Sequence, residues 1–243
     1  MKEAHYETLF TTEENHWWYR VRRKIVTDLI SKYSQQEIKI VDIGCGTGRL
    51  MLDLQRLGQV FGMDASQKAI EFCRSRGITN LQLGDITRLP YEENEFDVVL
   101  CLDVLEHTED DIQAIKEIKR IAKPGGLIII FVPAFPFLWG VSDIVSNHFR
   151  RYTAKEMISK IEKENLHIVE DSYFNSILFL PIFITRKVVN LFKIPLKSEN
   201  NLNTGLVNKI LFYIFNFEAT LLKIIKLPFG VSYLMVLRKQ PHE

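Results

Sequence analysis

Three glycines at alternating positions, Gly44, Gly46 and Gly48, directly follow the apolar run at residues 38–43. Glycine lets a chain turn sharply and removes side chains where the backbone must lie against a ligand. The helix expected next would present free N–H groups to that ligand. A dinucleotide-binding turn would need glycine at position 49, where this chain has Arg49. The spacing therefore predicts a ligand-binding turn of another kind, with a purely structural turn as the alternative.

Two acidic residues end the next two expected strands. The carboxylate of Asp64 follows residues 60–63 and can accept hydrogen bonds from both hydroxyls of a ribose. Asp85 follows residues 80–83 and can accept from the amino group of an adenine, while Ile86 packs on the ring. Taken alone, Asp64 could merely cap the following helix, and Asp85 could be an ordinary turn aspartate.

Groups suited to proton transfer lie further along the chain. His148 is the preferred general base for a hydroxyl group, because Asp143, five residues earlier, can orient and charge-support its ring. His107, in the segment after residues 97–102, is the alternative base, and Glu106 would cap a turn or orient it. A polar loop network without catalytic role is the competing interpretation.

The loop at residues 133–152 is aromatic and rich in proline, and it carries groups that could bind an acceptor molecule. Arg150 and Arg151 could hold a phosphate or carboxylate. Trp139, with neighbouring phenylalanines, would line an apolar pocket, and we place Tyr152 with them. As surface pairs the arginines would need no ligand, and core packing explains part of the aromatic group.

Alternating strands and helices must position these residues. Strands alternating with helices of about ten residues predict a parallel sheet with right-handed crossovers, whose ligands bind beyond the carboxyl ends of the strands. Strands are expected at residues 38–43, 59–63, 80–83, 97–102, 126–132, 167–173 and 231–239. Helices are expected at residues 14–32, 49–57, 67–76, 110–121 and 154–164.

Taken in order, residues 41–48, Asp64, residues 84–86, 96–102 and 123–127 resemble the successive motifs of class I S-adenosylmethionine-dependent methyltransferases. The resemblance implies an α/β fold: a Rossmann-like seven-stranded sheet, mostly parallel, with helices on both faces and the last strand antiparallel. It implies S-adenosylmethionine as cofactor. The implied cofactor-binding residues, among which Asp42 holds the methionine ammonium, are Asp42, Gly44, Cys45, Gly46, Gly48, Asp64, Ala65, Asp85, Ile86 and Leu102.

Residues 14–24 and 133–153 resemble the type 11 methyltransferase subgroup, whose members often accompany genes for glycan or lipid-linked sugar assembly. The resemblance implies a small-molecule or lipid- or glycan-linked acceptor, and we expect O-methylation. We interpret residues 1–35 as a helical lid in which Tyr19 and Arg23 contact the cofactor. An amphipathic helix packed on the sheet edge is the alternative.

The methyltransferase domain would comprise residues 36–175 and 231–243, leaving residues 176–230 as a helical insertion. The usual connection here is a short hairpin, so about fifty extra residues need a reason. The insertion carries apolar clusters and an excess of five positive charges, which is typical of a segment that docks on an anionic membrane or accepts a lipid-linked substrate. A helical pair packed on the sheet or on a second subunit is the alternative.

Composition restricts the other possibilities. A formal net charge of +1 over 243 residues argues against a nucleic-acid-binding surface. The three cysteines form no plausible metal-binding set with the six histidines, so we expect no metal, reduced thiols and a cytoplasmic enzyme. Docking through residues 176–230 would make that enzyme peripheral at the membrane. An oxidoreductase using NAD or a nucleotide sugar, and a non-enzymatic scaffold that binds S-adenosylmethionine, are the alternative functions. The oligomeric state is left open.

Overall fold

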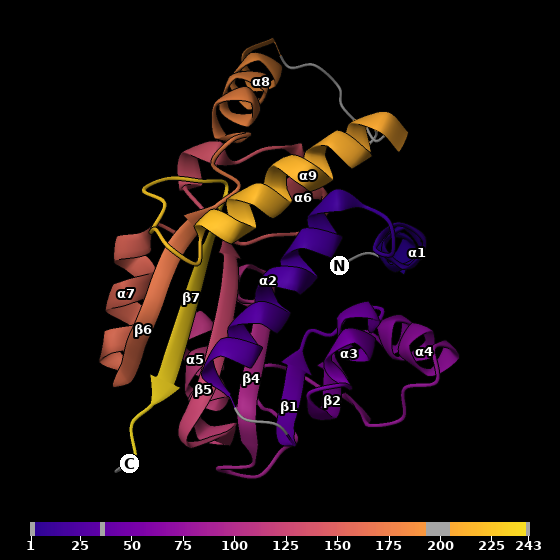
Figure 1. Cartoon of the computed structure of the whole chain (residues 1–243), viewed down its shortest axis with the longest axis vertical. Coiled ribbons are helices and arrows are strands. Elements are labelled where there is room, and N and C mark those ends of the chain that lie inside the picture. Colours follow the sequence, from indigo (N-terminus) through magenta and orange to yellow (C-terminus); the bar gives the residue numbers. More distant parts are fainter. Residues whose placement is uncertain (1–2, 35–36, 193–204, 242–243) are drawn as a thin grey trace.

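The computed structural model describes residues 3–34, 37–192 and 205–241. Its centre is a seven-stranded sheet in the order β3-β2-β1-β4-β5-β7-β6 (Figure 1). Strand β7 is antiparallel to both of its neighbours, while the pairs among β1 to β5 are parallel. The expected mostly parallel sheet with an antiparallel last strand is confirmed. The strands are β1 (Ile38–Ile43), β2 (Gly58–Asp64), β3 (Leu81–Leu83), β4 (Phe96–Leu102), β5 (Ala122–Pro133), β6 (Leu166–Phe174) and β7 (Ser232–Lys239).

The central strands are apolar on both faces because helices cover both sides of the sheet. One face packs against α2 (Trp17–Tyr33), α3 (Arg49–Leu54) and α9 (Gly205–Leu221). The other packs against α5 (Asp111–Ile121) and α7 (Ala154–Lys163). Helix α4 (Gln67–Ser75) contacts β2 and β3 at the edge of the sheet. In Figure 1, α9 crosses the same face of the sheet as α2.

The helix expected at residues 14–32 is present as α2. The N-terminal segment also contains a helix that was not expected. It forms two helices, α1 (Glu3–Thr12) and α2, separated by a short turn. The side chain of His16 accepts a hydrogen bond from the Trp18 N–H and caps the start of α2. The side chain of Thr12 bonds back to the carbonyl of Thr8, at the last turn of α1. The break therefore comes from a histidine cap, which is not among the residues usually found at helix starts.

The loop after β5 and the segment before β7 contain further helical elements. A 3₁₀ turn, η2 (Pro136–Leu138), and a short helix, α6 (Val141–Val145), lie in the loop, and a second 3₁₀ turn, η1 (Leu105–His107), follows β4. Between β6 and β7 lie α8 (Phe179–Phe192) and α9. No helix in the described ranges is both long enough and apolar enough to cross a membrane.

Candidate active site

The glycine turn joins the carboxyl end of β1 to α3. Gly44, Gly46 and Gly48 all have positive φ, at 73°, 57° and 81°. A Cβ at Gly44 would lie 2.3 Å from Cγ2 of Val104, and one at Gly48 would lie 2.7 Å from Cδ1 of Ile78. Both backbone conformation and crowding therefore require glycine at these two positions.

Asp64, at the carboxyl end of β2, is bonded directly to this turn. Its Oδ2 accepts the Gly46 N–H at 2.9 Å, and its Oδ1 accepts the Ser66 N–H at 2.9 Å and the Tyr6 hydroxyl at 3.1 Å. The side chain is buried, and burial raises the pKa of Asp64. The two features that the sequence analysis put together, the glycines and this acid, do lie together.

Asp42 is a second buried carboxyl group at the same end of the sheet. Burial raises the pKa of Asp42 to about 7, although the charge of Arg22 opposes the shift. Arg22, on α2, forms an ion pair with Asp103, which directly follows β4. A buried carboxylate that is this costly to ionise is a good partner for a cationic ligand.

Helix α1 covers the glycine turn. The side chain of Leu9 lies against Gly46, and Phe10 stacks on Phe72 of α4 with ring centroids 4.5 Å apart. Glu13 is buried, where it accepts hydrogen bonds from the Thr47 hydroxyl and, at 2.8 Å, from Arg76. These contacts were not predicted from the sequence. The available signal is the spacing of residues 6, 9, 10 and 13, which places them on one side of a helix.

The other expected cofactor contacts are placed as follows. Arg23 is bound within the protein, to Asp53 at 2.9 Å and to the Glu13 carbonyl, whereas Tyr19 lies beside Arg22. Cys45, Ile86 and Leu102 are buried, and Ala65 is exposed. Asp85 is exposed and accepts the N–H and hydroxyl of Thr87, each at 2.7 Å. That arrangement is an Asx turn, the alternative role considered for Asp85.

On the acceptor side, Asp143 is fully buried and holds His148. The distance from His148 Nδ1 to Asp143 Oδ1 is 2.9 Å, and Arg151 Nε donates to the same oxygen at 2.7 Å. Burial opposes ionisation, but the bonds from His148 and Arg151 lower the pKa of Asp143 to about 2. Since Asp143 is a carboxylate, His148 Nδ1 donates to it and leaves Nε2 for other chemistry.

His107 lies beside His148, so the structure brings both candidate bases together. Their rings make an edge contact with centroids 4.6 Å apart. Glu106 is 1% exposed, and its Oε2 has no hydrogen-bond partner among the described residues. Burial, with a contribution from Asp103, raises the pKa of Glu106 well above its usual range.

The expected acceptor-binding residues form contacts within the protein. Arg151 is buried and also donates to the Ala134 carbonyl at 2.9 Å. The buried Tyr152 hydroxyl donates to Asp111 at 2.9 Å, and Arg150 pairs with the same carboxylate at 3.2 Å. Trp139 is half-buried. This resembles the polar loop network that the sequence analysis considered as the competing interpretation.

Arg186 of α8 was not expected at this site. It is buried, lies 3.5 Å from Asp143 Oδ2 and donates to the Leu138 carbonyl. From the sequence, Arg186 was one of the basic residues that give the insertion its positive charge. Its partners at residues 138 and 143 lie far along the chain and could not be predicted from local sequence. The insertion therefore contributes a side chain that binds the loop at residues 133–152, which we call the acceptor loop.

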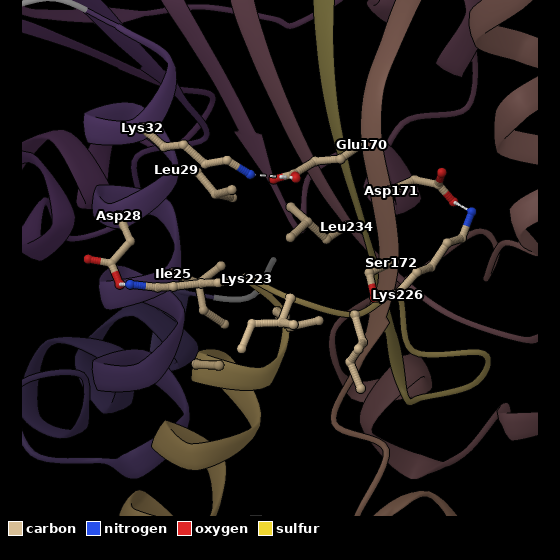
Figure 2. Close-up of a pocket in the computed structure, with 14 residues that line it drawn as sticks. Ile25, Asp28, Leu29, Lys32, Glu170, Asp171, Ser172, Lys223, Lys226 and Leu234 are labelled. Carbon is tan, nitrogen blue, oxygen red and sulfur yellow. Dashed lines mark hydrogen bonds and ion pairs between the residues drawn. The ribbon is translucent and has the colours of Figure 1, made fainter.

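A cavity of about 420 Å³ lies on the face of the sheet that α2 covers. Figure 2 shows that ion pairs border it: Lys32 with Glu170 at 2.9 Å, Lys223 with Asp28 at 2.8 Å and Lys226 with Asp171 at 2.5 Å. None of the expected site residues lines this cavity. The pairs of Lys223 and Lys226 fasten the chain after α9 onto α2 and β6, and the pair of Lys32 joins α2 to β6.

Comparison with known proteins identifies the family. Residues 41–130 match a family described as a methyltransferase domain, of type 11. A demethylmenaquinone methyltransferase of Staphylococcus epidermidis is 30% identical over 167 residues, which cover 65% of this chain and 68% of that protein. The chain belongs to the class I S-adenosylmethionine-dependent methyltransferases of the type 11 subgroup. An uncharacterized methyltransferase of Schizosaccharomyces pombe is 32% identical over 130 residues, which cover 47% of this methyltransferase and 46% of the yeast protein.

Solved structures show the same fold at lower identity. A Haloferax volcanii methyltransferase, solved with the Trm112 methyltransferase activator, has a TM-score of 0.63 and 19% identity, and the match covers 99% of this methyltransferase and 95% of that chain. An S-adenosylmethionine-dependent methyltransferase from Archaeoglobus fulgidus has a TM-score of 0.56 and 18% identity, covering 89% and 94%.

S-adenosylmethionine is the cofactor of this methyltransferase, as the sequence analysis expected. The residues present suit it. The cofactor carries an ammonium and a sulfonium, and the turn brings the buried carboxyl groups of Asp42 and Asp64 to one end of the sheet. The glycine turn leaves backbone rather than side chains beside them.

Proposed function

We propose that the methyltransferase O-methylates a small-molecule or lipid- or glycan-linked acceptor while docked on a membrane surface. The observation that carries this proposal is the buried Asp143 carboxylate bonded to His148, because that pair suits proton removal from a hydroxyl. The demethylmenaquinone methyltransferases among the relatives support a small-molecule acceptor.

On the cofactor side, bound S-adenosylmethionine supplies an electrophilic methyl group. We assign Asp42 to its ammonium and Asp64 to its ribose hydroxyls, with Asp85 and Ile86 at the adenine. Tyr6 now donates to Asp64 Oδ1, so α1 must shift before a ribose hydroxyl takes that position. The further contacts that we assign are Gly44, Cys45, Gly46, Gly48, Ala65 and Leu102, with Tyr19 and Arg23 in the lid.

We add Arg22 to the lid residues that contact the cofactor. Its charge acts on Asp42 and it pairs with Asp103, whereas Arg23 points to Asp53. We therefore assign the cofactor carboxylate to Arg22 in preference to Arg23. Arginine suits this role because its planar guanidinium can form paired bonds with a carboxylate.

On the acceptor side, His148 Nε2 takes the proton and Asp143 stabilises the imidazolium that forms. His107 is the alternative base. Trp139, Arg150, Arg151 and Tyr152 are assigned to the acceptor pocket. Because Arg151 and Tyr152 are buried and bonded within the protein, we expect them to shape the pocket more than to contact an anionic group.

Membrane docking is supported by exposed apolar residues on two helices. On α9 they recur at helical spacing, at Leu206, Ile210, Tyr213 and Phe217, each at least 50% exposed. The opposite side of α9 buries Phe215 and Ala219. A similar stripe on α8 comprises Leu180, Ile184 and Val188. Exposed apolar stripes of this extent mark interaction surfaces.

The charges contribute less to docking than the sequence suggested. Arg186 is buried, and Lys223 and Lys226 pair with acidic residues of the sheet and α2. Lys187 and Lys209 are exposed, while Lys193 and Lys197 lie outside the described residues. We therefore expect apolar burial to dominate over attraction to anionic lipid.

A transfer screen tests the acceptor class. Methyl-labelled S-adenosylmethionine is incubated with the enzyme and three acceptor sets: demethylmenaquinone reduced to its quinol, which carries ring hydroxyls, lipid-linked sugars and nucleotide-linked sugars. We expect label on a hydroxyl oxygen of one set, and a rate about 10²- to 10⁴-fold lower in His148→Ala. Label found only on nitrogen or carbon would contradict O-methylation.

A further inference from the structure

Glu106, His107 and His148 form a cluster of metal-ligating side chains beside the acceptor loop. One donor atom from each residue lies within 4.8 Å of those of the other two. Glu106 and His107 come from η1, directly after β4, and His148 follows α6. Two segments about forty residues apart in the sequence therefore bring a carboxylate and two imidazoles to one point.

The carboxylate of Glu106 lacks a partner that its burial demands. It is 1% exposed, yet Oε2 accepts no hydrogen bond from the residues that the structure describes. Buried carboxylates in proteins are normally hydrogen-bonded, ion-paired or bound to metals. An ion held by the Glu106 carboxylate and the two imidazoles would supply the missing partner.

His148 is already held as a metal-binding histidine would be. Its Nδ1 lies 2.9 Å from the buried Asp143 carboxylate, which is fixed in turn by the Gly140 N–H and Arg151. A carboxylate on one ring nitrogen fixes the tautomer, directs the other nitrogen to a metal and makes it a better ligand. Nε2 is therefore the nitrogen available for coordination.

We propose that Glu106, His107 and His148 bind a divalent transition-metal ion, with Asp143 as the residue that positions His148. Two imidazole nitrogens and one carboxylate oxygen suit Zn²⁺ and its neighbours better than Mg²⁺ or Ca²⁺, which prefer oxygen ligands. No metal was expected from the sequence, because the cysteines and histidines form no plausible metal-binding set.

The three donor atoms must come closer together before they can bind one ion. Ligand atoms about 2.0–2.2 Å from a tetrahedral ion lie roughly 3.4 Å from one another, so donor atoms that now lie within 4.8 Å must approach by at most about 1.4 Å. Both histidine side chains are partly exposed, and we expect their rotation to bring the donor atoms together. Three protein ligands also leave a coordination position open, as in zinc sites that bind a water or a substrate.

The ion would take the same nitrogen that the proposed base uses. Metal binding would therefore prevent His148 from accepting a proton, and this consequence rests on the proposed function. Binding itself does not, because it can be measured without cofactor or acceptor.

The experiment is a Zn²⁺ titration of the full chain without a histidine tag, followed by calorimetry, with Co²⁺ absorption as a second readout of coordination. Wild type should bind one ion per chain. Glu106→Gln and His148→Ala should each lower the affinity at least about 100-fold, and Asp143→Asn by about 10- to 100-fold. His167→Ala removes an exposed histidine of β6 and should change nothing.

Circular dichroism establishes that each variant is folded. If Glu106→Gln does not fold, His107→Ala replaces it, since His107 is only partly buried. A wild type that binds no Zn²⁺ overturns the proposal. So does an affinity that the cluster variants leave unchanged, or one that falls as much in His167→Ala as in His148→Ala.

Discussion

At the scale of single residues, Asp42 and Asp64 show how position within one site gives two carboxylates different properties. Asp64 accepts three hydrogen bonds, from Gly46, Ser66 and Tyr6. Asp42 is buried with Arg22 as its nearby cation, and burial raises its pKa to about 7. Asp64 is thus stabilised by the protein alone, whereas the charged form of Asp42 gains most from a bound cation.

We predict that the affinity for S-adenosylmethionine falls as the pH is lowered from 8 to 6. In the role that we propose for Asp42 its charged form binds the ammonium, and protonation below a pKa of about 7 removes that charge. One pH unit below the pKa, only about a tenth of the carboxyl groups remain ionised, so affinity should fall about tenfold. Calorimetry across this range measures it. Asp42→Asn should bind more weakly and without this slope; an identical slope in the variant would assign the titration elsewhere.

The base assignment gives a second prediction. His148→Ala should lower turnover by about 10²- to 10⁴-fold with a hydroxyl acceptor, because proton removal is lost. Affinity for S-adenosylmethionine should stay unchanged, since His148 bonds to Asp143 and not to the glycine turn. Single-turnover kinetics and calorimetry separate the two effects. A wild-type rate in His148→Ala, together with an inactive His107→Ala, would move the base to His107.

At the scale of elements, the sequence predicted strands better than the docking of helices. The strands are buried on both faces, so their apolar runs mark them directly. The approach of α1 to the glycine turn depends on Tyr6, Leu9 and Phe10, whose partners lie far along the chain. The site residues of β1 and β2 were predictable from local order, whereas Glu13 and Arg186 reach the site from other elements.

The glycine turn allows a prediction about stability. Gly48→Ala should be destabilised by the left-handed conformation and by contact with Ile78 and Cys73. Gly77→Ala is the matched variant, since Gly77 has the same φ of 81° but no atom within 4 Å of its Cβ position. Strain alone should cost Gly77→Ala about 1–2 kcal/mol, and crowding should cost Gly48→Ala about 1–3 kcal/mol more. Urea unfolding measures both. Equal losses would show that Gly48 is not crowded.

The exposed stripe of α9 gives a prediction about membranes. The protein should co-sediment with anionic liposomes at low salt and largely remain bound at high salt, because apolar burial dominates. The double variant Tyr213→Ser, Phe217→Ser should lose binding, and Lys187→Ser with Lys209→Ser should lose less. Folded wild-type protein that fails to bind at both salt concentrations would make the stripe a contact for another protein surface.

At the scale of the whole molecule, the fold was predictable because the methyltransferase motifs occur in order along nearly a hundred residues. The insertion before β7 was predictable in length and helical character, but not in its contacts. Arg186 reaches Asp143, and Lys223 and Lys226 pair across to α2 and β6. These long-range ion pairs join the insertion to the domain. Three of its basic residues therefore stabilise the contact between insertion and domain.

Calorimetric titration of the whole chain with S-adenosylmethionine, and separately with NAD⁺, tests the central claim most directly. The account predicts saturable binding of S-adenosylmethionine at one site per chain and none of NAD⁺. Asp64→Ala should weaken that binding by about 1.5–3 kcal/mol, the range for hydrogen bonds involving a charged group. Binding of NAD⁺ in place of S-adenosylmethionine, or an affinity that folded Asp64→Ala leaves unchanged, would contradict it.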